Sequence, residues 1–432
     1  MINSMKILIL SSVPWSNENC FGNSFSGIFA GIDSIEIANI ALRPGLPTSP
    51  LVIRYFQITE KALLRNLKNK MNPSGTEILL NHTNVPQEFC EDIKARKFGQ
   101  KRRWQILFWA RDLIWAAGRW KSPQLEKFVG DYDPDVIFQP VYYSSYLNDI
   151  AQYIKKYTNV PMIGYISDDC YTLKQFSFSP LYWIDRLYKR RKVKQTIEMC
   201  ELLYVISDIQ KEDYEKCFTT TCKILTKGAD FGEALKLKEQ YGQPLQLVFT
   251  GNIGTNRWKS LKLIAGALEN INKEGIIAQL RIYTATPITK KMDKALNRGE
   301  SSFLMGSVPA SEVAGIQEKS DILVHVEALD LKNKLTVRQS FSTKIVDYLK
   351  AARPILAVGP KDVASIDHLI RNDCAIVASS GKELEDKLST VLSNESELNR
   401  IAQNAYECGK RHHNKQDIQT MLMNDLREVC GE

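Results

Sequence analysis

The stretch Phe341–Gly359, FSTKIVDYLKAARPILAVG, decides how the fold of this chain is read. Ser342 and Thr343 are residue types that begin helices, and Lys344 follows them directly. The apolar run Ile355–Val358 has the length and composition of a buried parallel strand. A helix N-terminus carries unpaired N–H groups and a partial positive charge, so hydroxyls and an ammonium beside it make an anion site. A capped helix that merely leads into a core strand fits the same stretch equally well.

Strands and helices alternate around this stretch. Apolar runs of strand length in the second half of the chain are Leu245–Thr250, Gln279–Thr284, Phe303–Val308, Ile322–Val326 and Ala375–Val377. Helical segments between them are about Asn256–Ile271, Lys290–Leu296 and Asp362–Arg371, and we expect Ala328–Ser340 to be a polar loop. Repeated strand–helix units predict a parallel, right-handed, doubly wound sheet.

The first half shows the same pattern with longer insertions. Its strand candidates are Lys6–Leu10, Glu36–Ala41, Glu77–Leu80, Asp135–Gln139, Pro161–Ile166 and Leu202–Ile206. A chain of 432 residues is too long for one core. The composition becomes Lys/Glu-rich, with Gly and Pro, at Gly232–Pro244, and we place a domain boundary there. The predicted fold class is α/β, with Rossmann-like doubly wound parallel-sheet domains over residues 1–240 and 241–409 that face a central cleft.

Composition excludes several classes of protein. The chain is 44% apolar and 25% charged, as in ordinary soluble globular proteins. No apolar run is long enough to span a bilayer, and we expect the N-terminus to be a first strand rather than an export signal. Nine cysteines without paired spacing predict reduced thiols in the cytoplasm. Neither they nor the five histidines have the spacing of metal ligands, so no metal site is expected.

The net charge of +8 is unevenly placed. Between Lys94 and Lys127 the chain has ten Lys and Arg but only two acidic residues. A second basic cluster is Arg186–Lys194. The segment Arg102–Lys121 adds four tryptophans and is apolar on nearly all sides as a helix. A helix packed inside the domain and a helix at an anionic membrane surface both fit. RNA binding is a third reading, but no nucleic-acid motif accompanies the charge, and we expect no nucleic-acid partner.

A glycine turn precedes the first helix of the second half. Gly251 and Gly254 allow the backbone to approach a ligand closely, and Arg257 and Lys259 follow one turn into the helix. This turn and the Ser342–Lys344 helix start both follow strands of one parallel sheet, so both should open on the same edge. Two cationic helix starts on one edge suit a diphosphate.

The order and spacing of these motifs resemble a retaining GT-B glycosyltransferase of the family-4-like, bacterial surface-glycan type. The resemblance covers residues 245–380 well and the first 240 residues only loosely. It implies a donor diphosphate site on the glycine loop and the basic pair after it, made of Gly251, Asn252, Gly254, Arg257 and Lys259. Ser342–Tyr348, STKIVDY, is similar to the family's Pro-Ser-Lys-Leu-x-Glu-Tyr, which makes Ser342, Thr343 and Lys344 further donor contacts.

The family hallmark is a pair of glutamates eight positions apart. Anchoring on Ala352-Arg353-Pro354 places Asp347 at the second glutamate, which binds the ribose hydroxyls, and Gln339 at the first, beside the donor sugar. Gln339 lacks the expected charge, and Glu327 or Arg338 could partly replace it.

In the first half only two features map onto the family. Gly22 and Asn23 occupy the place of its acceptor loop. Asp168, just past a predicted strand, falls near a residue of the catalytic cleft. From position alone, a carboxylate at such a place is more often a helix cap or a turn residue than a catalytic group. The last helices, residues 410–432, would cross back to the first domain.

The resemblance implies a hexosyltransferase-like enzyme that moves a sugar from a nucleotide-diphosphate donor to a glycan or lipid-linked acceptor in surface polysaccharide synthesis. We expect no cofactor and no metal ion, because Arg257, Lys259 and Lys344 supply positive charge and no Asp-x-Asp motif lies in the second domain. We expect a cytoplasmic protein that can lie at the inner face of the membrane. Two alternatives stay open: a catalytically degenerate nucleotide-sugar-binding partner subunit, and a nucleotide-sugar epimerase.

Overall fold

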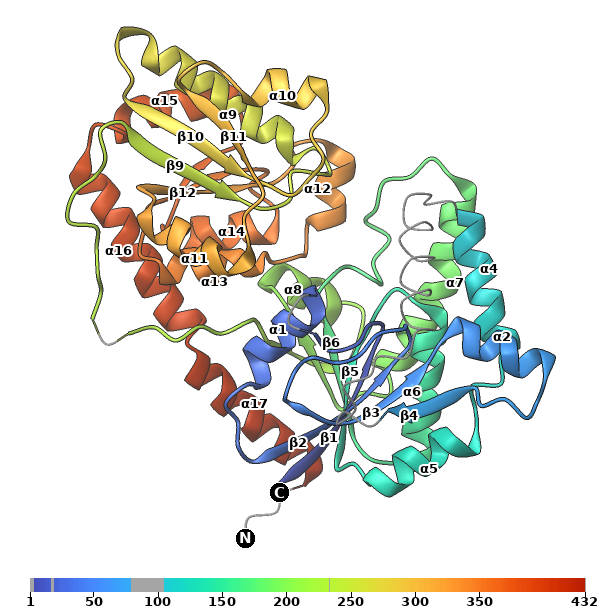
Figure 1. Ribbon diagram of the computed structural model, residues 1–432. Helices are drawn as coiled ribbons and strands as arrows, with labels where there is room; N and C mark the ends of the chain where they lie inside the picture. Colours follow the sequence, from blue (N-terminus) through green and yellow to red (C-terminus); the bar gives the residue numbers. More distant parts are fainter. Residues whose placement is uncertain (1–3, 17–18, 79–104, 233, 432) are drawn as a thin grey trace. The chain divides into compact units, whose positions relative to one another are not determined.

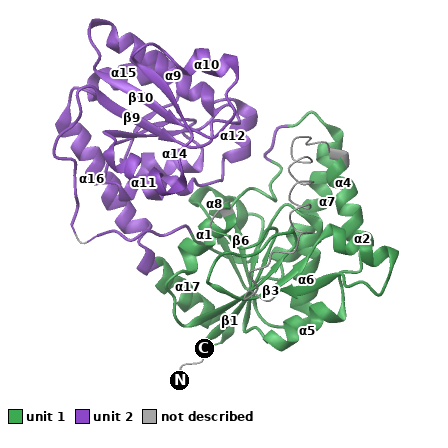
Figure 2. Cartoon of the chain, in the orientation of Figure 1, with its two compact units in different colours: residues 1–173, 177–225, 418–432 green, residues 174–176, 226–417 purple. Residues whose placement is uncertain are grey.

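The structure is a computed structural model that describes residues 4–16, 19–78, 105–232 and 234–431 (Figure 1). The chain divides into two compact units (Figure 2). Unit 1 comprises Met1–Leu173, Ser177–Leu225 and Ile418–Glu432, and unit 2 comprises Lys174–Phe176 and Thr226–Asp417. The chain therefore passes between the units at 173/174, 176/177, 225/226 and 417/418, whereas the sequence placed boundaries at 240/241 and 409/410.

Unit 1 is built on an eight-stranded sheet with the order β4-β3-β2-β1-β5-β6-β7-β8. Its strands are β1 Met5–Ser11, β2 Ile35–Ala41, β3 Val52–Ile58, β4 Gly75–Ile78, β5 Val136–Pro140, β6 Met162–Ile166, β7 Leu202–Val205 and β8 Thr221–Ile224. Neighbouring strands are parallel except β3 and β4, which are antiparallel. The sequence did not predict β3 or β8, and the parallel sheet it predicted has an antiparallel edge.

Helices cover both faces of this sheet (Figure 1). They are α1 Cys20–Phe29, α2 Glu60–Lys68, α4 Gln105–Ala117, α5 Pro123–Tyr132, α6 Ser145–Thr158, α7 Pro180–Ile197, α8 Asp208–Glu215 and the final helix α17 Lys415–Cys430. From Ile418 onward α17 belongs to unit 1, where Leu422 and Leu426 join the core. The buried Asp425 carboxylate of α17 accepts hydrogen bonds from Tyr204 and Lys223, both at 2.5 Å.

Unit 2 holds a six-stranded parallel sheet with the order β11-β10-β9-β12-β13-β14. Its strands are β9 Leu245–Thr250, β10 Ala278–Tyr283, β11 Ser302–Gly306, β12 Ile322–Val326, β13 Ile355–Val358 and β14 Ile376–Ala378. Its helices are α9 Arg257–Ile271, η1 Asn272–Glu274, α10 Lys290–Leu296, α11 Ala310–Lys319, α12 Leu331–Val337, α13 Thr343–Lys350, α14 Ala364–Arg371, α15 Gly381–Val391 and α16 Glu395–His412. The predicted doubly wound sheet is confirmed, but the expected polar loop Ala328–Ser340 contains α12.

The strand order of unit 2 reverses between β9 and β12. Loops that leave two adjacent parallel strands in opposite directions open a crevice at the carboxyl ends of those strands, and open α/β sheets bind ligands there. Gly251 follows β9 and Glu327 follows β12. The topology of the sheet thus brings these two residues to the edge where a ligand is expected.

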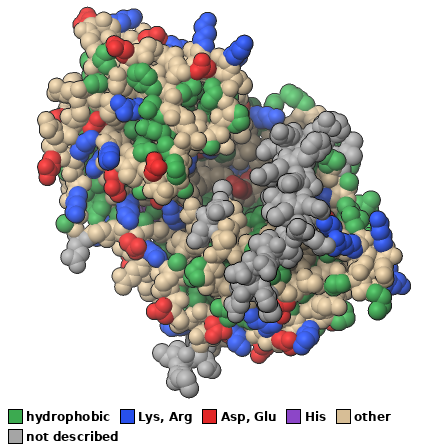
Figure 3. Space-filling view, viewed as in Figure 1, with side chains coloured by type: hydrophobic (Ala, Val, Ile, Leu, Met, Phe, Trp, Pro, Cys, Tyr) green, Lys and Arg blue, Asp and Glu red, His purple; other side chains and the backbone are tan. Residues whose placement is uncertain are grey.

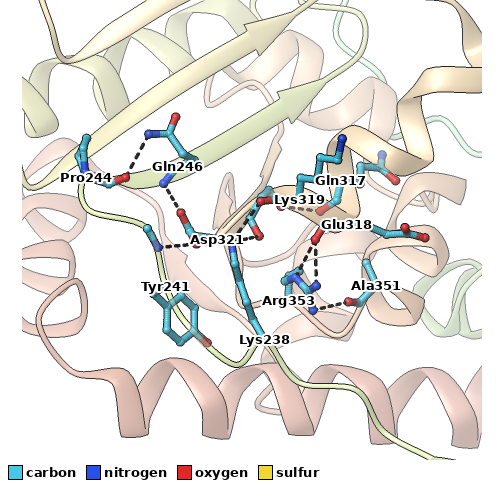
Figure 4. A network of polar contacts seen from close by, with 12 residues as sticks. Lys238, Tyr241, Pro244, Gln246, Gln317, Glu318, Lys319, Asp321, Ala351 and Arg353 are labelled. Atoms are coloured by element: carbon cyan, nitrogen blue, oxygen red, sulfur yellow. Dashed lines mark hydrogen bonds and ion pairs between the residues drawn. The ribbon is translucent and has the colours of Figure 1, made fainter.

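The amino ends of the same two strands carry a polar network around Asp321 (Figure 4). The Asp321 carboxylate is 1% exposed and accepts hydrogen bonds from the backbone N–H of Gln246, at 2.6 Å, and of Gly242, at 3.0 Å. Lys238 adds an ion pair to the same carboxylate. Arg353 donates to the backbone carbonyl of Glu318. Lys238, Gly242 and Gln246, which lead into β9, are therefore fixed to the Asp321 carboxylate.

The Trp-rich segment is a packed helix, α4, in the described part of Arg102–Lys121. Trp115 is fully buried and stacks on Tyr146, and the Trp109 indole donates to Asp185. Trp104 lies outside the described residues. Trp115 therefore belongs to the interior of unit 1, and half-buried Trp109 joins α4 to Asp185 of α7.

The second basic cluster contributes less surface charge than the sequence suggested. Arg186 is 3% exposed and is paired with Asp169, while Lys189 is 4% exposed and is paired with Asp112 and Asp185. Both cations neutralise buried carboxylates. In the part of the chain that the structure describes, no helix has the length and hydropathy to cross a bilayer.

Candidate functional site

The Lys344 ammonium lies at the carboxyl end of β9. Its Nζ donates a hydrogen bond to the backbone carbonyl of Thr250, at 2.8 Å. Gly251 follows with φ +147°, and a Cβ added there would lie 1.7 Å from Lys344 Nζ. The backbone conformation favours glycine at this position, and any larger residue would displace the Lys344 ammonium from the place it occupies. Two motifs about 90 residues apart in the sequence meet at this point, as predicted.

Arg257 and Glu327 form the second feature of this edge. The guanidinium at the start of α9 binds the Glu327 carboxylate through two hydrogen bonds of 3.0 Å, from Nε and Nη2. The Glu327 side chain is 5% exposed, whereas Arg257 is 29% exposed. Ser260 Oγ donates to the backbone carbonyl of Glu327 at 2.7 Å and fixes the end of β12 against α9. A bidentate pair of this geometry holds the arginine in one orientation.

Buried ionisable groups give this edge unusual protonation behaviour. His325 lies beneath the site, with Nε2 3.3 Å from Ser365 Oγ and 3.7 Å from Glu327 Oε1. Burial, together with the positive charges of Arg257 and Lys344, lowers the pKa of His325 to about 3, so the imidazole is neutral. Burial raises the pKa of Glu327, and Arg257 opposes that shift.

The glycine loop is shaped by its own side chains. Asn252 Oδ1 accepts from the Gly254 N–H, at 2.6 Å, and from Thr286 Oγ1, at 3.2 Å. Asn252 therefore fixes the turn, a structural role in addition to the predicted donor contact. Lys259 is exposed, and its ammonium lies 6.0 Å from the centroid of the Trp258 ring.

Asn256 has a left-handed backbone, with φ 65°, and its side chain donates to Asp330 Oδ2 at 2.9 Å. Asp330 also caps α12 by accepting from the Asn333 N–H. The loop before α9 is thereby joined to α12, which neither motif of the sequence indicated.

The helix α13 begins at this edge. Ser342 is its N-cap residue, and its side chain makes no capping hydrogen bond. Asp347 lies one turn into the helix, and its side chain is 41% exposed. It accepts an ion-paired hydrogen bond of 2.7 Å from Lys227. The carboxylate predicted to bind ribose hydroxyls is thus accessible and has a cation beside it.

The remaining predicted site residues lie elsewhere. Gln339 is 2% exposed in unit 2. Asp168 is exposed in unit 1, beyond the end of β6, next to Asp169, which is bound to Arg186. Gly22 and Asn23 were expected in a loop, but α1 begins at Cys20, so both lie in its first turn. The cause is Asn19, whose side chain caps the helix by accepting from the Gly22 N–H.

Sequence reasoning missed the role of His325 and Lys227 at this edge. Both are isolated in the sequence from the motifs they contact: Lys227 lies 120 residues from Asp347. The sequence pattern predicted only that His325 belongs to a buried strand. Among the described residues, no group of three or more His, Cys, Asp or Glu is arranged to hold a metal ion.

Comparison with known proteins agrees with this architecture. Residues 236–423 match the family model of glycosyl transferase-like proteins. No curated protein matches the chain in sequence. The structure is similar to sucrose-phosphate synthase from Thermosynechococcus elongatus, with a TM-score of 0.61 and 12% identity, over 98% of this chain and 99% of that one.

Two further solved structures have the same fold. One is Anabaena HepE in complex with UDP-glucose, with a TM-score of 0.57 and 13% identity, over 98% of this chain and 100% of that one. The other is the α,α-trehalose 6-phosphate synthase from Burkholderia multivorans, with a TM-score of 0.59 and 10% identity, over 99% of this chain and 97% of that one. At such identities the likeness establishes the fold. The two-sheet architecture is therefore the GT-B fold, and the match to the glycosyl transferase-like family model lies within residues 236–423.

Proposed function

We propose that this chain is a retaining, metal-independent glycosyltransferase that moves a sugar from a nucleotide-diphosphate donor to a glycan or lipid-linked acceptor in surface polysaccharide synthesis. The observation that carries the proposal is the meeting of Lys344, Gly251 and Arg257 at the switch point of the unit 2 sheet. A diphosphate at this edge would meet an ammonium, a guanidinium and the N-terminus of α13 together.

These groups suit a departing nucleotide diphosphate. Negative charge builds on the leaving diphosphate as the bond between the donor sugar and its phosphate breaks. Preorganised cations stabilise that charge without reorganising. Arg257 is held in place by Glu327, and Lys344 by the Thr250 carbonyl. The Asp347 carboxylate would accept hydrogen bonds from the ribose hydroxyls, and Lys227 would fix the orientation of that carboxylate.

Glu327 is our candidate for the carboxylate near the sugar. Gln339, at the position the family gives to a glutamate, carries no charge and is buried. Glu327 instead supplies a carboxylate at the end of β12, on the edge where Gly251 lies. We propose that it replaces the missing charge, and that Asp168 of unit 1 is a second candidate for the catalytic set.

The acceptor side of the proposal involves the surface of unit 1. Trp109–Asp185 and Asp112–Lys189 contacts join α4 to α7. Large apolar side chains on these two helices are exposed to solvent: Leu107, Phe108, Leu113, Leu181, Ile184, Leu187 and Tyr188. Figure 3 shows that the right-hand edge of unit 1, where Figure 1 draws α2, also carries hydrophobic side chains beside basic ones.

A pocket of about 730 Å³ lies beside this apolar surface, between α4, α6 and α7. The exposed cations Arg119, Lys121 and Lys156 line it. Apolar side chains next to exposed cations suit the interface of an anionic membrane. We therefore propose that the chain works at the cytoplasmic face of a membrane.

A product assay tests the transfer reaction. The purified chain, in the presence of EDTA, is incubated with UDP-, GDP- and TDP-sugars and with glycan or polyisoprenyl-diphosphate-linked acceptors, and products are identified by NMR. We expect an acceptor-dependent product with the anomeric configuration of the donor. An inverted product refutes the retaining mechanism. Conversion of the donor without acceptor identifies an epimerase instead.

A degenerate partner subunit is the second candidate, and the uncharged Gln339 is the observation that favours it. It predicts donor binding with neither hydrolysis nor transfer across the acceptor panel. Replacing Gln339→Glu separates the two: a gain of transfer from an inactive starting protein supports the degenerate subunit.

Liposome flotation tests the membrane part. Vesicles of phosphatidylglycerol should bind the wild type and lose most binding to the triple variant Arg119→Gln, Lys121→Gln, Lys156→Gln. The matched control neutralises Lys273, Lys294 and Lys382 of unit 2 with the same change of charge. Equal binding of both variants contradicts the membrane proposal.

A further inference from the structure

Three cations of the pocket between α4, α6 and α7 have no partner of opposite charge. Arg119, Lys121 and Lys156 line this pocket and are exposed, and within the described residues no carboxylate forms an ion pair with any of them. The Lys121 ammonium lies instead over two aromatic rings, 5.3 Å from the centroid of Trp120 and 5.2 Å from that of Tyr153. An anion that enters the pocket would compensate these charges.

The two carboxylates that line the pocket do not compensate the three cations. Each already has a lysine partner: Asp149 pairs with Lys192, at 2.8 Å, and Asp112 with Lys189, at 3.1 Å. Each of these pairs is neutral as a whole, so the positive charge of the lining is left for a ligand. A phosphate monoester, which carries a charge of about −1.5 to −2 at neutral pH, suits such a site.

The same carboxylates offer acceptors to a ligand that also carries hydroxyl groups. The Asp149 side chain is 34% exposed, and Lys192 binds it through Oδ1. In Asp112, Lys189 binds Oδ2, whereas Oδ1 is buried and has no hydrogen-bond partner in the part of the chain that the structure describes. The lining thus has more acceptors than the donors of the chain satisfy, and hydroxyl groups are the donors that a ligand would supply.

Aromatic side chains form the apolar part of the lining. Trp120 meets Tyr153 of α6 edge to face, with centroids 5.5 Å apart, and the Tyr153 hydroxyl donates to Glu126, which fixes this ring. Tyr188 of α7 also lines the pocket and is 52% exposed. Rings of this kind pack against the C–H face of a sugar. The volume of about 730 Å³ lies within the range of about 300–1,000 Å³ found for small-molecule pockets.

We propose that this pocket binds a glycosyl phosphate. The phosphate lies among the three cations, the sugar ring lies against the aromatic lining, and the sugar hydroxyls donate to Asp149. The inference deepens the proposed function and rests on it for one point, that the bound group is part of the acceptor. A soluble sugar phosphate and the head group of a lipid-linked sugar share this chemistry.

An anionic phospholipid would use only part of the pocket. Its glycerol phosphate head group compensates the cations but has no ring to pack against the aromatic lining. A glycosyl phosphate uses both. Preference for a hexose phosphate over glycerol 3-phosphate is therefore the property that separates this pocket from a general contact with an anionic membrane.

Calorimetry of the full chain tests the proposal. The probes are the 1-phosphates of glucose, galactose and N-acetylglucosamine, with glycerol 3-phosphate, inorganic phosphate and glucose as comparisons. We expect at least one hexose 1-phosphate to bind about tenfold more tightly than any comparison compound. The double variant Arg119→Gln, Lys156→Gln should lose about tenfold in affinity for it. The matched control Lys127→Gln, Lys216→Gln changes two exposed lysines of unit 1 outside the pocket and should bind as the wild type does.

A second pair of variants tests the aromatic lining. Tyr188→Ala should weaken binding of the hexose 1-phosphate several-fold and leave that of glycerol 3-phosphate unchanged, because only the sugar ring packs against Tyr188. Ile184→Ala removes an apolar side chain of the same helix that is 60% exposed and does not line the pocket. It should change neither affinity.

Flotation of phosphatidylcholine vesicles with and without polyisoprenyl-diphosphate-linked glucose separates the two sources of the ligand. Flotation only with the vesicles that carry the sugar supports the head group of a lipid-linked sugar. Calorimetric binding without such flotation supports a soluble sugar phosphate. Binding in neither experiment overturns the proposal. Equal affinity for the hexose 1-phosphates and glycerol 3-phosphate, or unchanged affinity in the Arg119 and Lys156 double variant, also overturns it.

UDP binding separates this inference from the proposed donor site. Lys344→Ala should lose UDP binding and still bind the hexose 1-phosphate, whereas the Arg119 and Lys156 double variant should do the reverse. A wild type that binds the hexose 1-phosphate but no nucleotide refutes the donor site and leaves the pocket assigned. Loss of hexose 1-phosphate binding in Lys344→Ala alone places that ligand at the donor edge and overturns the inference.

Discussion

The strands β9 and β12 carry a buried carboxylate near each of their two ends, and the two carboxylates are held differently. Asp321, at the amino ends, is 1% exposed and receives two backbone N–H groups and the Lys238 ammonium. Glu327, at the carboxyl ends, is 5% exposed, and the contacts described for its side chain are those with Arg257 and His325. Backbone donors bind Asp321 permanently, whereas a side chain that is 29% exposed binds Glu327.

The comparison separates structure from function within one sheet. A carboxylate saturated by backbone groups cannot release its partners without unfolding the segment that carries them. The Arg257 guanidinium can bind a ligand without leaving Glu327, because it is 29% exposed and only its Nε and Nη2 donate to that carboxylate. We therefore assign the amino edge to stability and the carboxyl edge to donor binding.

The largest effect is expected from removing the Asp321 carboxylate. Asp321→Ala should lower the free energy of unfolding by about 3–5 kcal/mol, because Lys238 and two backbone N–H groups lose their acceptor. Urea unfolding followed by circular dichroism measures it. Glu327→Ala is the matched change at the other edge and should cost less stability but abolish most turnover. Equal effects of the two variants on stability and on turnover would contradict the assignment of the amino edge to stability and of the carboxyl edge to donor binding.

The next effect concerns turnover. Arg257→Ala and Lys344→Ala should each remove about 2–4 kcal/mol of transition-state stabilisation, which is roughly a 30- to 1000-fold loss of kcat/KM. Initial rates with a saturating acceptor measure this loss. Lys238→Ala, at the amino edge, is the control and should keep its rate per folded molecule. Near-wild-type turnover in either test variant would contradict the assignment of Arg257 and Lys344 to the donor site.

Two glycines with similar backbone conformations allow a finer test. Gly251 has φ +147° and Gly275 has φ +157°. Replacing either glycine by alanine should lower the free energy of unfolding of the protein by about 1–3 kcal/mol. An added Cβ at Gly251 meets Lys344 Nζ, whereas nothing lies within 4 Å at Gly275. Gly251→Ala should therefore weaken UDP binding at least tenfold by calorimetry, and Gly275→Ala should leave it unchanged. Similar affinities in the two variants would show that the Lys344 position is irrelevant.

The smallest effect is a pH dependence of stability. The pKa of His325 and that of His413 are lowered to about 3 by burial, so the folded state binds fewer protons than the unfolded state between pH 3 and 6.5. Stability should fall as the pH drops below 6.5, by about 1.4 kcal/mol per histidine at pH 5.5. Urea unfolding at pH 7.5 and 5.5 measures the fall. A His325→Gln variant with the same pH dependence as the wild type contradicts the burial of a neutral imidazole.

Much of the fold of unit 2 follows from the sequence, because buried parallel strands are continuous apolar runs. Leu245–Thr250, Lys290–Leu296 and Ile322–Val326 have the predicted bounds. The helix α12 escaped prediction because it has no buried residue and its start depends on Asp330, a cap that is not distinctive in a polar stretch. In unit 1 the sequence did not indicate that α1 begins at Cys20, because the Asn19 cap lies within a polar segment typical of a loop.

The candidate site could be predicted where topology alone decides proximity. Gly251 and Lys344 meet because both follow strands of one sheet, and their contact needs no side-chain detail. The pairing of Arg257 with Glu327 and of Lys227 with Asp347 depends on the paths of loops, which no periodic pattern encodes. For the same reason no pattern in the sequence indicated that Arg186 and Lys189 neutralise buried carboxylates instead of adding charge to the surface.

Thermal unfolding with nucleotides is the decisive test of a donor site at the carboxyl edge of the unit 2 sheet. Wild type, Lys344→Ala and Lys238→Ala are each heated in EDTA with UDP, GDP or TDP, because a ligand that binds only the folded state raises its stability. We expect at least one nucleotide to raise the Tm of wild type and of Lys238→Ala, and we expect Lys344→Ala to lose this shift. A shift that survives in Lys344→Ala, or its absence from the wild type with all three nucleotides, would contradict the donor site at the carboxyl edge of unit 2.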